Sequence, residues 1–149
     1  MEQPEPDADA VMSRILLAVD QTGSSDRASA EAITRAGATR ADLLVLSVVE
    51  PRNLSLPGGL PRRVDQERDR LTIGAQTIVR RARDAGVDAT FLIWEGDPAE
   101  AILDAASAEQ ADLIILGSRP RTNIRRLILG SVSSEVARRA TCEVVVVPG

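Results

Sequence analysis

The chain has 149 residues, a formal net charge of −4, 44% hydrophobic residues and 27% charged residues. This length and composition fit one folded domain. Histidine, lysine and tyrosine are absent, so all 18 basic residues are arginine. The missing residue types exclude a Ser-His-Asp triad, a histidine-ligated metal site, a lysine Schiff base and a Walker-type phosphate lysine.

Charge and cysteine content limit the partners and the cellular location that we expect for the protein. The mildly acidic balance argues against nucleic acid or an anionic membrane surface as the main partner. A single cysteine cannot form an intrachain disulfide, and no segment is apolar over the length of a membrane span. Residues 1–12 are rich in acids and prolines and lack the features of a signal peptide. We expect a cytoplasmic protein with a disordered acidic tail at 1–12 and one domain at 13–149.

Apolar runs and segments of helical periodicity alternate along the chain. In chain order they lie at 15–19 (strand), 28–36 (helix), 43–49 (strand), 64–85 (helix), 89–94 (strand), 98–105 (helix), 114–116 (strand), 131–140 (helix) and 144–147 (strand). Runs that are apolar at nearly every position are typical of strands covered on both sheet faces. The alternation predicts an α/β fold, an open five-stranded parallel sheet with helices on both faces.

Local signals refine this prediction. Asp97 and Pro98 are typical of a helix start, because aspartate accepts from the first N–H groups and proline suits the first helical position. Gly86 is placed to end the helix before it, and residues 21–25 supply turn and capping residues after the first strand. The third strand is mixed in polarity, which favours a place near a sheet edge. Phe91 and Trp94 should then lie on opposite faces.

A parallel sheet of this kind binds ligands beyond the carboxyl ends of its strands, where the strand order reverses. The residues at those ends are Asp20, Val49, Glu50, Trp94, Glu95, Gly117 and Ser118. For Asp20, contact with a ligand is favoured over a purely local capping role.

Residues 117–131 hold the densest group of candidate ligand contacts. Gly130 and Ser131 open a helix, whose first N–H groups lack partners and attract anions. Ser131 and Ser133 can add hydroxyl hydrogen bonds. Positive charge near this point comes from Arg119, Arg121, Arg125 and Arg126. A plainer interpretation stays open, in which Ser131 only caps the helix and the arginines are a solvated surface.

The pattern Gly117-x2-Pro120-x9-Gly130-Ser131 resembles the universal stress protein family, whose nucleotide-binding members carry G-x2-G-x9-G-[S/T]. Further motifs agree at 15–20, at Ser24-Ser25, at 112–118, at 132–136 and at 142–148. The resemblance covers essentially residues 13–149.

The resemblance implies a Rossmann-like fold of the adenine nucleotide alpha hydrolase type, usually dimeric, that binds ATP or a related adenine nucleotide and acts in stress responses. By position it assigns Ala18, Val19 and Asp20 to the adenosine end, Val48 to the adenine ring, Leu116 and Gly117 to the floor, Arg119 to the mouth, and Gly130, Ser131, Val132 and Ser133 to the phosphate cradle. ATP or AMP is the expected ligand, with Mg²⁺ as an optional companion. A second copy would cover the edge of the strand from Val144 to Val147.

Pro120 departs from the family pattern, which has glycine there. Proline has no N–H to donate and its φ is held near −65°. The loss of one phosphate contact would weaken binding by about tenfold. We therefore expect weakened rather than abolished nucleotide binding.

Three functions follow, in order of preference. The first is a nucleotide-binding regulatory module that is no enzyme beyond a slow ATPase. The second is the same fold without nucleotide, acting through protein contacts, which Pro120 favours. The third is an adenylate-forming or hydrolytic nucleotide enzyme, to which residues 20–25 are a poor match. Cys142 has no neighbouring base to lower its pKa and is expected to be a small core filler.

Overall fold

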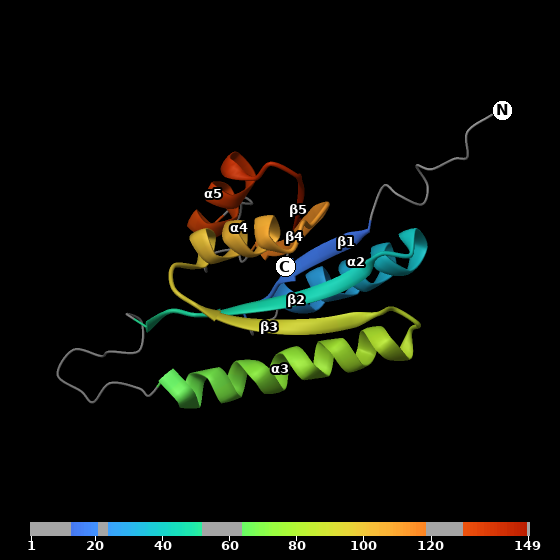
Figure 1. Cartoon of the computed structure of the whole chain (residues 1–149), viewed down its shortest axis with the longest axis horizontal. Coiled ribbons are helices and arrows are strands. Elements are labelled where there is room, and N and C mark those ends of the chain that lie inside the picture. Colours follow the sequence, from blue (N-terminus) through green and yellow to red (C-terminus); the bar gives the residue numbers. More distant parts are fainter. Residues whose placement is uncertain (1–12, 21–23, 52–63, 119–129, 149) are drawn as a thin grey trace.

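The computed structural model describes residues 13–20, 24–51, 64–118 and 130–148 (Figure 1). Its elements in chain order are β1 (Arg14–Ala18), α2 (Ser24–Thr39), β2 (Asp42–Val49), α3 (Val64–Asp84), β3 (Ala89–Glu95), α4 (Pro98–Ala108), β4 (Leu113–Ser118), α5 (Ser131–Arg139) and β5 (Glu143–Pro148). The predicted alternation of strands and helices is confirmed. The expected tail at 1–12 lies outside the described residues.

The five strands form one parallel sheet in the order β3-β2-β1-β4-β5. The chain first builds outward from β1 through β2 to β3, then crosses back to place β4 on the other side of β1. The strand order therefore reverses between β1 and β4. A crevice at the carboxyl ends of these two strands is the expected ligand position in such a sheet.

Two helices cover each face of the sheet. Alternate strand residues such as Leu17 and Val45 pack with α2 and α3, while their neighbours such as Leu16 and Leu46 pack with α4 and α5. Ile15, Leu16 and Leu17 are fully buried because β1 is covered on both faces and both edges. This explains the continuous apolar runs in the sequence.

The predicted helix boundaries are correct to within a few residues. The Asp97 carboxylate accepts from the Glu100 N–H at 3.1 Å and caps α4. Gly86 has φ of 86°, a conformation that glycine adopts without a steric cost, just after α3. Residues 21–25 were expected to supply turn and capping residues, but Ser24 and Ser25 already belong to α2.

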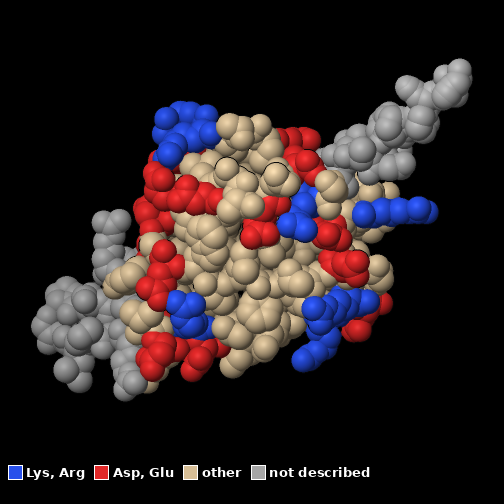
Figure 2. All heavy atoms as spheres, in the orientation of Figure 1, with Lys and Arg blue, Asp and Glu red and all other residues tan. Residues whose placement is uncertain are grey.

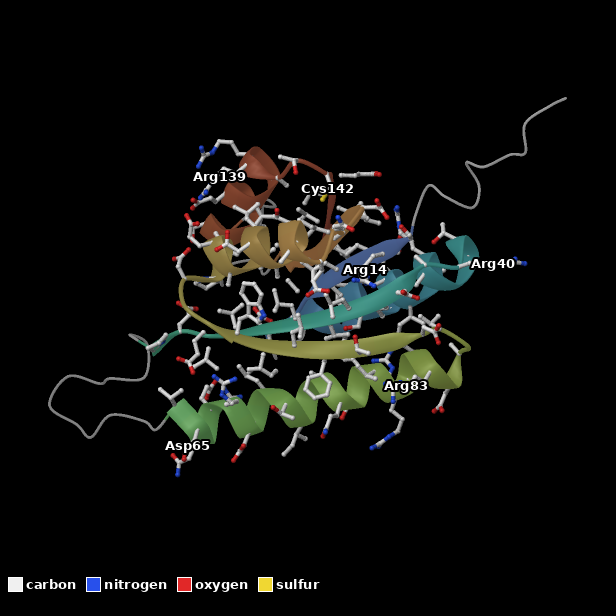
Figure 3. All side chains as sticks on the ribbon, in the orientation of Figure 1. Arg14, Arg40, Asp65, Arg83, Arg139 and Cys142 are labelled. Carbon is white, nitrogen blue, oxygen red and sulfur yellow. The ribbon has the colours of Figure 1, made fainter. Side chains whose placement is uncertain are left out.

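The two edge strands of the sheet, β3 and β5, differ in the side-chain hydrogen bonds that they receive. At the β3 edge, α3 runs alongside the strand and supplies arginines to both of its ends (Figures 1 and 3). Arg68 donates to the Ile93 carbonyl at 3.2 Å and pairs with Glu95, and Arg83 donates twice to the Ala89 carbonyl at 3.1 and 2.8 Å. In the part of the chain that the structure describes, no side chain bonds in this way to β5.

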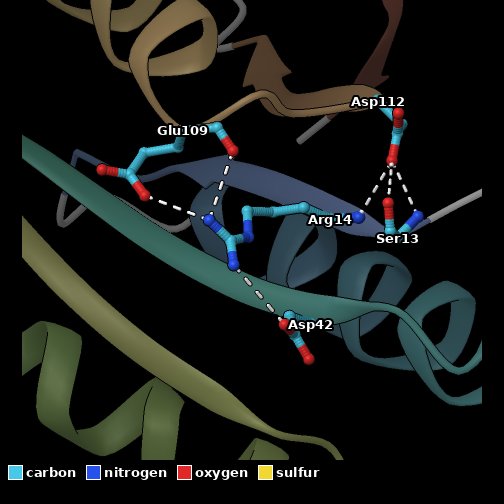
Figure 4. Close-up of polar contacts among 5 residues, drawn as sticks. All are labelled: Ser13, Arg14, Asp42, Glu109 and Asp112. Atoms are coloured by element: carbon cyan, nitrogen blue, oxygen red, sulfur yellow. Dashed lines mark hydrogen bonds and ion pairs between the residues drawn. The ribbon is translucent and has the colours of Figure 1, made fainter.

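One carboxylate holds the amino ends of β1 and β4 together (Figure 4). Asp112 accepts from the Ser13 N–H at 2.7 Å, the Ser13 hydroxyl at 3.0 Å and the Arg14 N–H at 3.0 Å. Burial alone would raise the pKa of Asp112, but these hydrogen bonds and the Arg14 charge outweigh it and hold the pKa below its usual value. The folded protein therefore favours the charged carboxylate.

Arg14 extends this contact to two more elements. Its guanidinium lies 3.1 Å from the Glu109 carboxylate, 3.2 Å from the Glu109 carbonyl at the end of α4, and 3.6 Å from the Asp42 carboxylate of β2. The amino edge of the sheet is thus tied across β1, β2 and β4.

Replacing Asp112 should show how much its carboxylate contributes to the free energy of unfolding. Asp112→Asn should lower the free energy of unfolding by about 1 kcal/mol at neutral pH, a modest figure because the carboxylate is partly solvated. The folded pKa of Asp112 is depressed, so its stabilisation is full above the unfolded pKa and is lost as the pH falls through the folded pKa. Urea denaturation at neutral and strongly acidic pH measures this loss.

The matched control is Asp104→Asn, because Asp104 is exposed on α4 and should leave stability unchanged. The destabilisation by Asp112→Asn should shrink in acid. A destabilisation that stays constant across the same pH range would contradict a role for the charge.

Candidate functional site

The candidate site lies at the carboxyl ends of β1 and β4. In the register of the sheet, Ala18 pairs with Leu46 of β2 on one side and with Leu116 of β4 on the other. Gly117 follows directly and pairs with Val147 of β5. The strand-order reversal therefore lies at Ala18, Leu116 and Gly117, the residues that the family resemblance assigns to the adenosine end and the floor of the site.

Four of the predicted site residues share one apolar cluster beneath α4 and α5. They are Ala18, Val48, Leu116 and Val132. Leu116 is buried, whereas the other three are half-buried. An apolar floor that remains partly accessible can receive the flat face of an aromatic ring.

Val19 lies differently from its neighbours. Its side chain packs in the opposite cluster, beneath α2 and α3, and is 6% exposed. Its N–H donates to the Leu46 carbonyl at 2.9 Å, and its carbonyl accepts from the buried Ser47 hydroxyl at 3.4 Å. Val19 therefore fixes the end of β1 through its backbone. Asp20 follows and is exposed at the edge of the sheet.

Gly130 is the N-cap of α5, with φ −69° and ψ 169° and no side-chain capping hydrogen bond. Ser131 is the first helical residue, so the alternative that Ser131 caps the helix was wrong. Ser133 is 3% exposed, and its hydroxyl donates to the Gly130 carbonyl at 3.2 Å. That leaves the exposed Ser131 as the hydroxyl better placed to meet a ligand, next to the first N–H groups of the helix.

Contacts in the second half of α5 hold the helix in place. Val136 is fully buried in the cluster with Leu116. Near the last turn, Arg139 donates to Glu100 of α4 at 2.8 Å and to Glu135 at 2.7 Å (Figure 3). Hydrogen bonds to Glu100 and Glu135 raise the pKa of Arg139 above its usual value. The position of the α5 N-terminus thus follows from packing on the sheet and on α4.

Cys142 precedes β5 and is half-buried against the cluster beneath α4 and α5 (Figure 3). Burial raises the pKa of its thiol, and the charges of Asp112 and Glu143 raise it further. A thiol with a raised pKa is a poor nucleophile, which agrees with a packing role.

Several sequence predictions fall on residues outside the described ranges. Arg119 and Pro120 are among them, as are the other arginines of that segment, Arg121, Arg125 and Arg126.

A separate cleft of about 500 Å³ lies at the amino edge, away from the predicted site. Its charged lining consists of Arg14, Asp42, Arg83, Asp88 and Glu109. Arg14 and Arg83 already bond to carboxylate or carbonyl oxygens of the protein. The cleft is also at the end of the sheet opposite to the usual ligand position. We therefore place the candidate site at the carboxyl edge.

Sequence reasoning missed one neighbour of the site, Ser47, and placed Trp94 at a strand end without showing which residue lies beside it. Ser47 supports the Val19 carbonyl, and Trp94 pairs in register with Val48 on the next strand outward. Strand alternation separates Trp94 from Phe91, as predicted, but only the register shows that Trp94 adjoins Val48.

A family model described as the Universal stress protein family matches residues 12–148. The chain belongs to this family. A universal stress protein of Thermus aquaticus is 41% identical over 139 residues, which cover 89% of this chain and 96% of the relative. The resemblance drawn from the sequence motifs is thereby confirmed.

Solved structures agree with the fold. A universal stress family protein from Burkholderia pseudomallei has a TM-score of 0.77 at 26% identity, covering 94% of this chain and 98% of that one. A universal stress protein solved in complex with cAMP has a TM-score of 0.70 at 25% identity, covering 93% and 98%. The predicted five-stranded parallel α/β architecture is confirmed.

Two further features are the distribution of charge on the surface and the length and polarity of the helices. On the face viewed in Figure 2, basic and acidic side chains of the described residues are interspersed around uncharged areas. Within residues 13–20, 24–51, 64–118 and 130–148, no helix combines the length and apolar character needed to cross a bilayer.

Proposed function

We propose that this universal stress family protein binds an adenine nucleotide, ATP or AMP, at the carboxyl edge between β1 and β4 and acts as a regulatory stress-response module. The observation that carries the proposal is the N-terminus of α5, whose glycine N-cap makes no side-chain capping bond, beside a partly accessible apolar floor. The cAMP complex of a structural relative supports the ligand class. A cytoplasmic location, where these nucleotides are available, fits the proposal.

In this proposal, the base and the ribose of the nucleotide each contact residues of suitable polarity. The base would lie on Val48 and Ala18, where apolar surface is accessible. Asp20 would accept from the base or the ribose at the end of β1. Leu116 and Gly117 would form the floor, with Arg119 proposed at the mouth.

The phosphates would meet the first turn of α5. The first N–H groups of a helix have no partner within the helix, and together with the helix dipole they favour an anion there, while Gly130 leaves room for close approach to the backbone. The backbone of Val132 and Ser133 and the hydroxyl of Ser131 complete the cradle. A Mg²⁺ ion would be held mainly by the phosphates, because the described residues contain no group of three acidic or thiol side chains placed to hold a metal.

The residue types present favour binding over catalysis. Without histidine or lysine in the chain, activation of water and neutralisation of charge on a leaving phosphate have few candidates. Any ATP hydrolysis should therefore be slow, and nucleotide occupancy would act through a change in conformation or assembly.

Gly130→Asp should separate binding from folding. A carboxylate at this position would repel phosphate, so nucleotide affinity should fall by at least about tenfold. Stability should be unchanged or slightly raised, because aspartate is a better N-cap than glycine by a few tenths of a kcal/mol. Calorimetric titration with ATP and thermal denaturation measure the two effects.

Gly130→Ala is the matched control. A Cβ at Gly130 would meet only the Ser133 hydroxyl at 4.0 Å, and the φ of −69° suits any residue. This variant adds a Cβ without a charge, so it should lose clearly less affinity than Gly130→Asp. Equal ATP affinity in Gly130→Asp and the wild type would overturn the proposed cradle.

We further propose that the protein forms a homodimer through β5. Its valines, Val144 to Val147, are all half-buried, and β5 is an edge strand of the sheet. An edge of this kind favours pairing with another chain unless it is covered. The contrast with β3, whose ends receive arginines from α3, supports β5 as the edge used.

Native mass spectrometry of Val146→Asp tests the dimer. The charge should disfavour a second copy at this edge, so the variant should be monomeric at concentrations where the wild type is dimeric. Ile73→Asp is the control, because Ile73 is 65% exposed on α3, away from β5. A dimeric Val146→Asp with unchanged circular dichroism would contradict assembly through this strand.

A further inference from the structure

We propose that Trp94 forms the outer wall of the base pocket and stacks against the adenine ring. This inference rests on the proposed nucleotide site and adds a residue that the family motif does not contain. It assigns to Trp94 a contribution to affinity for the base, distinct from the phosphate contacts of α5.

The sheet register places Trp94 beside the proposed base position. Val48 of β2 pairs directly with Trp94 of β3. Side chains paired across parallel strands lie on the same face, and adjacent strands are about 4.8 Å apart. A purine ring lying on Val48 would therefore reach the neighbouring strand. Both side chains belong to the cluster beneath α4 and α5, together with Ala18.

Trp94 is the residue on this side with a broad aromatic face to offer. Its side chain packs against the cluster yet remains half-buried rather than enclosed. Phe91, the one phenylalanine of the chain, packs on the opposite face of the same strand. An indole that is held on one side and accessible on the other is suited to stacking on a base.

The backbone on both sides of Trp94 is fixed. Arg68 of α3 donates to the Ile93 carbonyl at 3.2 Å and pairs with the Glu95 carboxylate. Gly96 then donates to the Val49 carbonyl at 2.9 Å, in a conformation with φ of 136° that favours glycine. An edge strand held in this way positions its tryptophan before a ligand arrives, which reduces the ordering cost of binding.

The chemistry of stacking sets the expected selectivity. Every base has an aromatic face, so Trp94 would strengthen binding of ATP and AMP by the same factor and would not by itself distinguish adenine from guanine. Inorganic triphosphate, which lacks a base, should not depend on Trp94.

The composition of the chain makes the test direct. Trp94 is its single tryptophan and tyrosine is absent, so intrinsic indole fluorescence comes from this side chain alone. Titration of the wild-type protein with ATP should change this fluorescence with the same midpoint as the heat of binding in calorimetry. Free N-acetyltryptophanamide, titrated in parallel, corrects for absorption and collisional quenching by the nucleotide.

Variants give the second measurement. Trp94→Leu should weaken ATP and AMP by about tenfold, whereas Trp94→Phe should keep most of the affinity. Phe91→Leu is the matched control, because it removes an aromatic ring from the opposite face of β3 and should leave affinity within about twofold. Where Trp94→Leu is poorly folded, the fluorescence titration of the wild-type protein still tests the inference, because it needs no substitution.

The outcomes separate the inference from the function on which it rests. A fluorescence change at the calorimetric midpoint, with weaker binding only in Trp94→Leu, supports the stacking contact. Calorimetric binding of ATP with unchanged fluorescence and unchanged affinity in Trp94→Leu would overturn the inference and leave the nucleotide site standing. An absence of calorimetric binding to the wild type would overturn both.

Discussion

Burial of β1 at the centre of the parallel sheet is the constraint on which the rest of the structure depends. The strand has β2 on one side, β4 on the other and helices over both faces, and its central residues Ile15, Leu16 and Leu17 have no exposed surface. The backbone N–H and carbonyl groups of these central residues must therefore find hydrogen-bond partners inside the protein. The strand order reverses between β1 and β4, so the expected ligand position lies where β1 ends, at Ala18.

The two ends of β1 have different properties. At the amino end, Asp112 and Arg14 tie the strand to β4, β2 and α4. At the carboxyl end, the side chains are half-buried and apolar, and α5 presents a first turn without a side-chain cap. An amino edge tied by ion pairs and a partly accessible, apolar carboxyl edge agree with the proposed nucleotide site at the carboxyl edge.

Local signals in the sequence were enough to predict the elements. Apolar runs identify strands because both sheet faces are covered, and Asp97, Pro98 and Gly86 mark helix ends through capping and backbone conformation. The strand order and register were beyond the same reasoning, since they depend on contacts between distant residues. Asp112 bonds to Ser13 from 99 positions away, and only the register brings Val48 and Trp94 together. The N-cap of α5 was ambiguous by one residue, because both Gly130 and Ser131 are acceptable at that position.

Amide chemical shifts test the proposed nucleotide site at the carboxyl edge residue by residue. ATP titrated into ¹⁵N-labelled protein should move the amide signals of Ala18, Asp20, Gly117, Ser131 and Val132 at the carboxyl edge. The signals of Asp42, Asp88 and Asp112 at the amino edge should stay in place. Shifts confined to the amino edge would place the ligand in the other cleft, and the absence of any shift at saturating ATP would contradict nucleotide binding altogether.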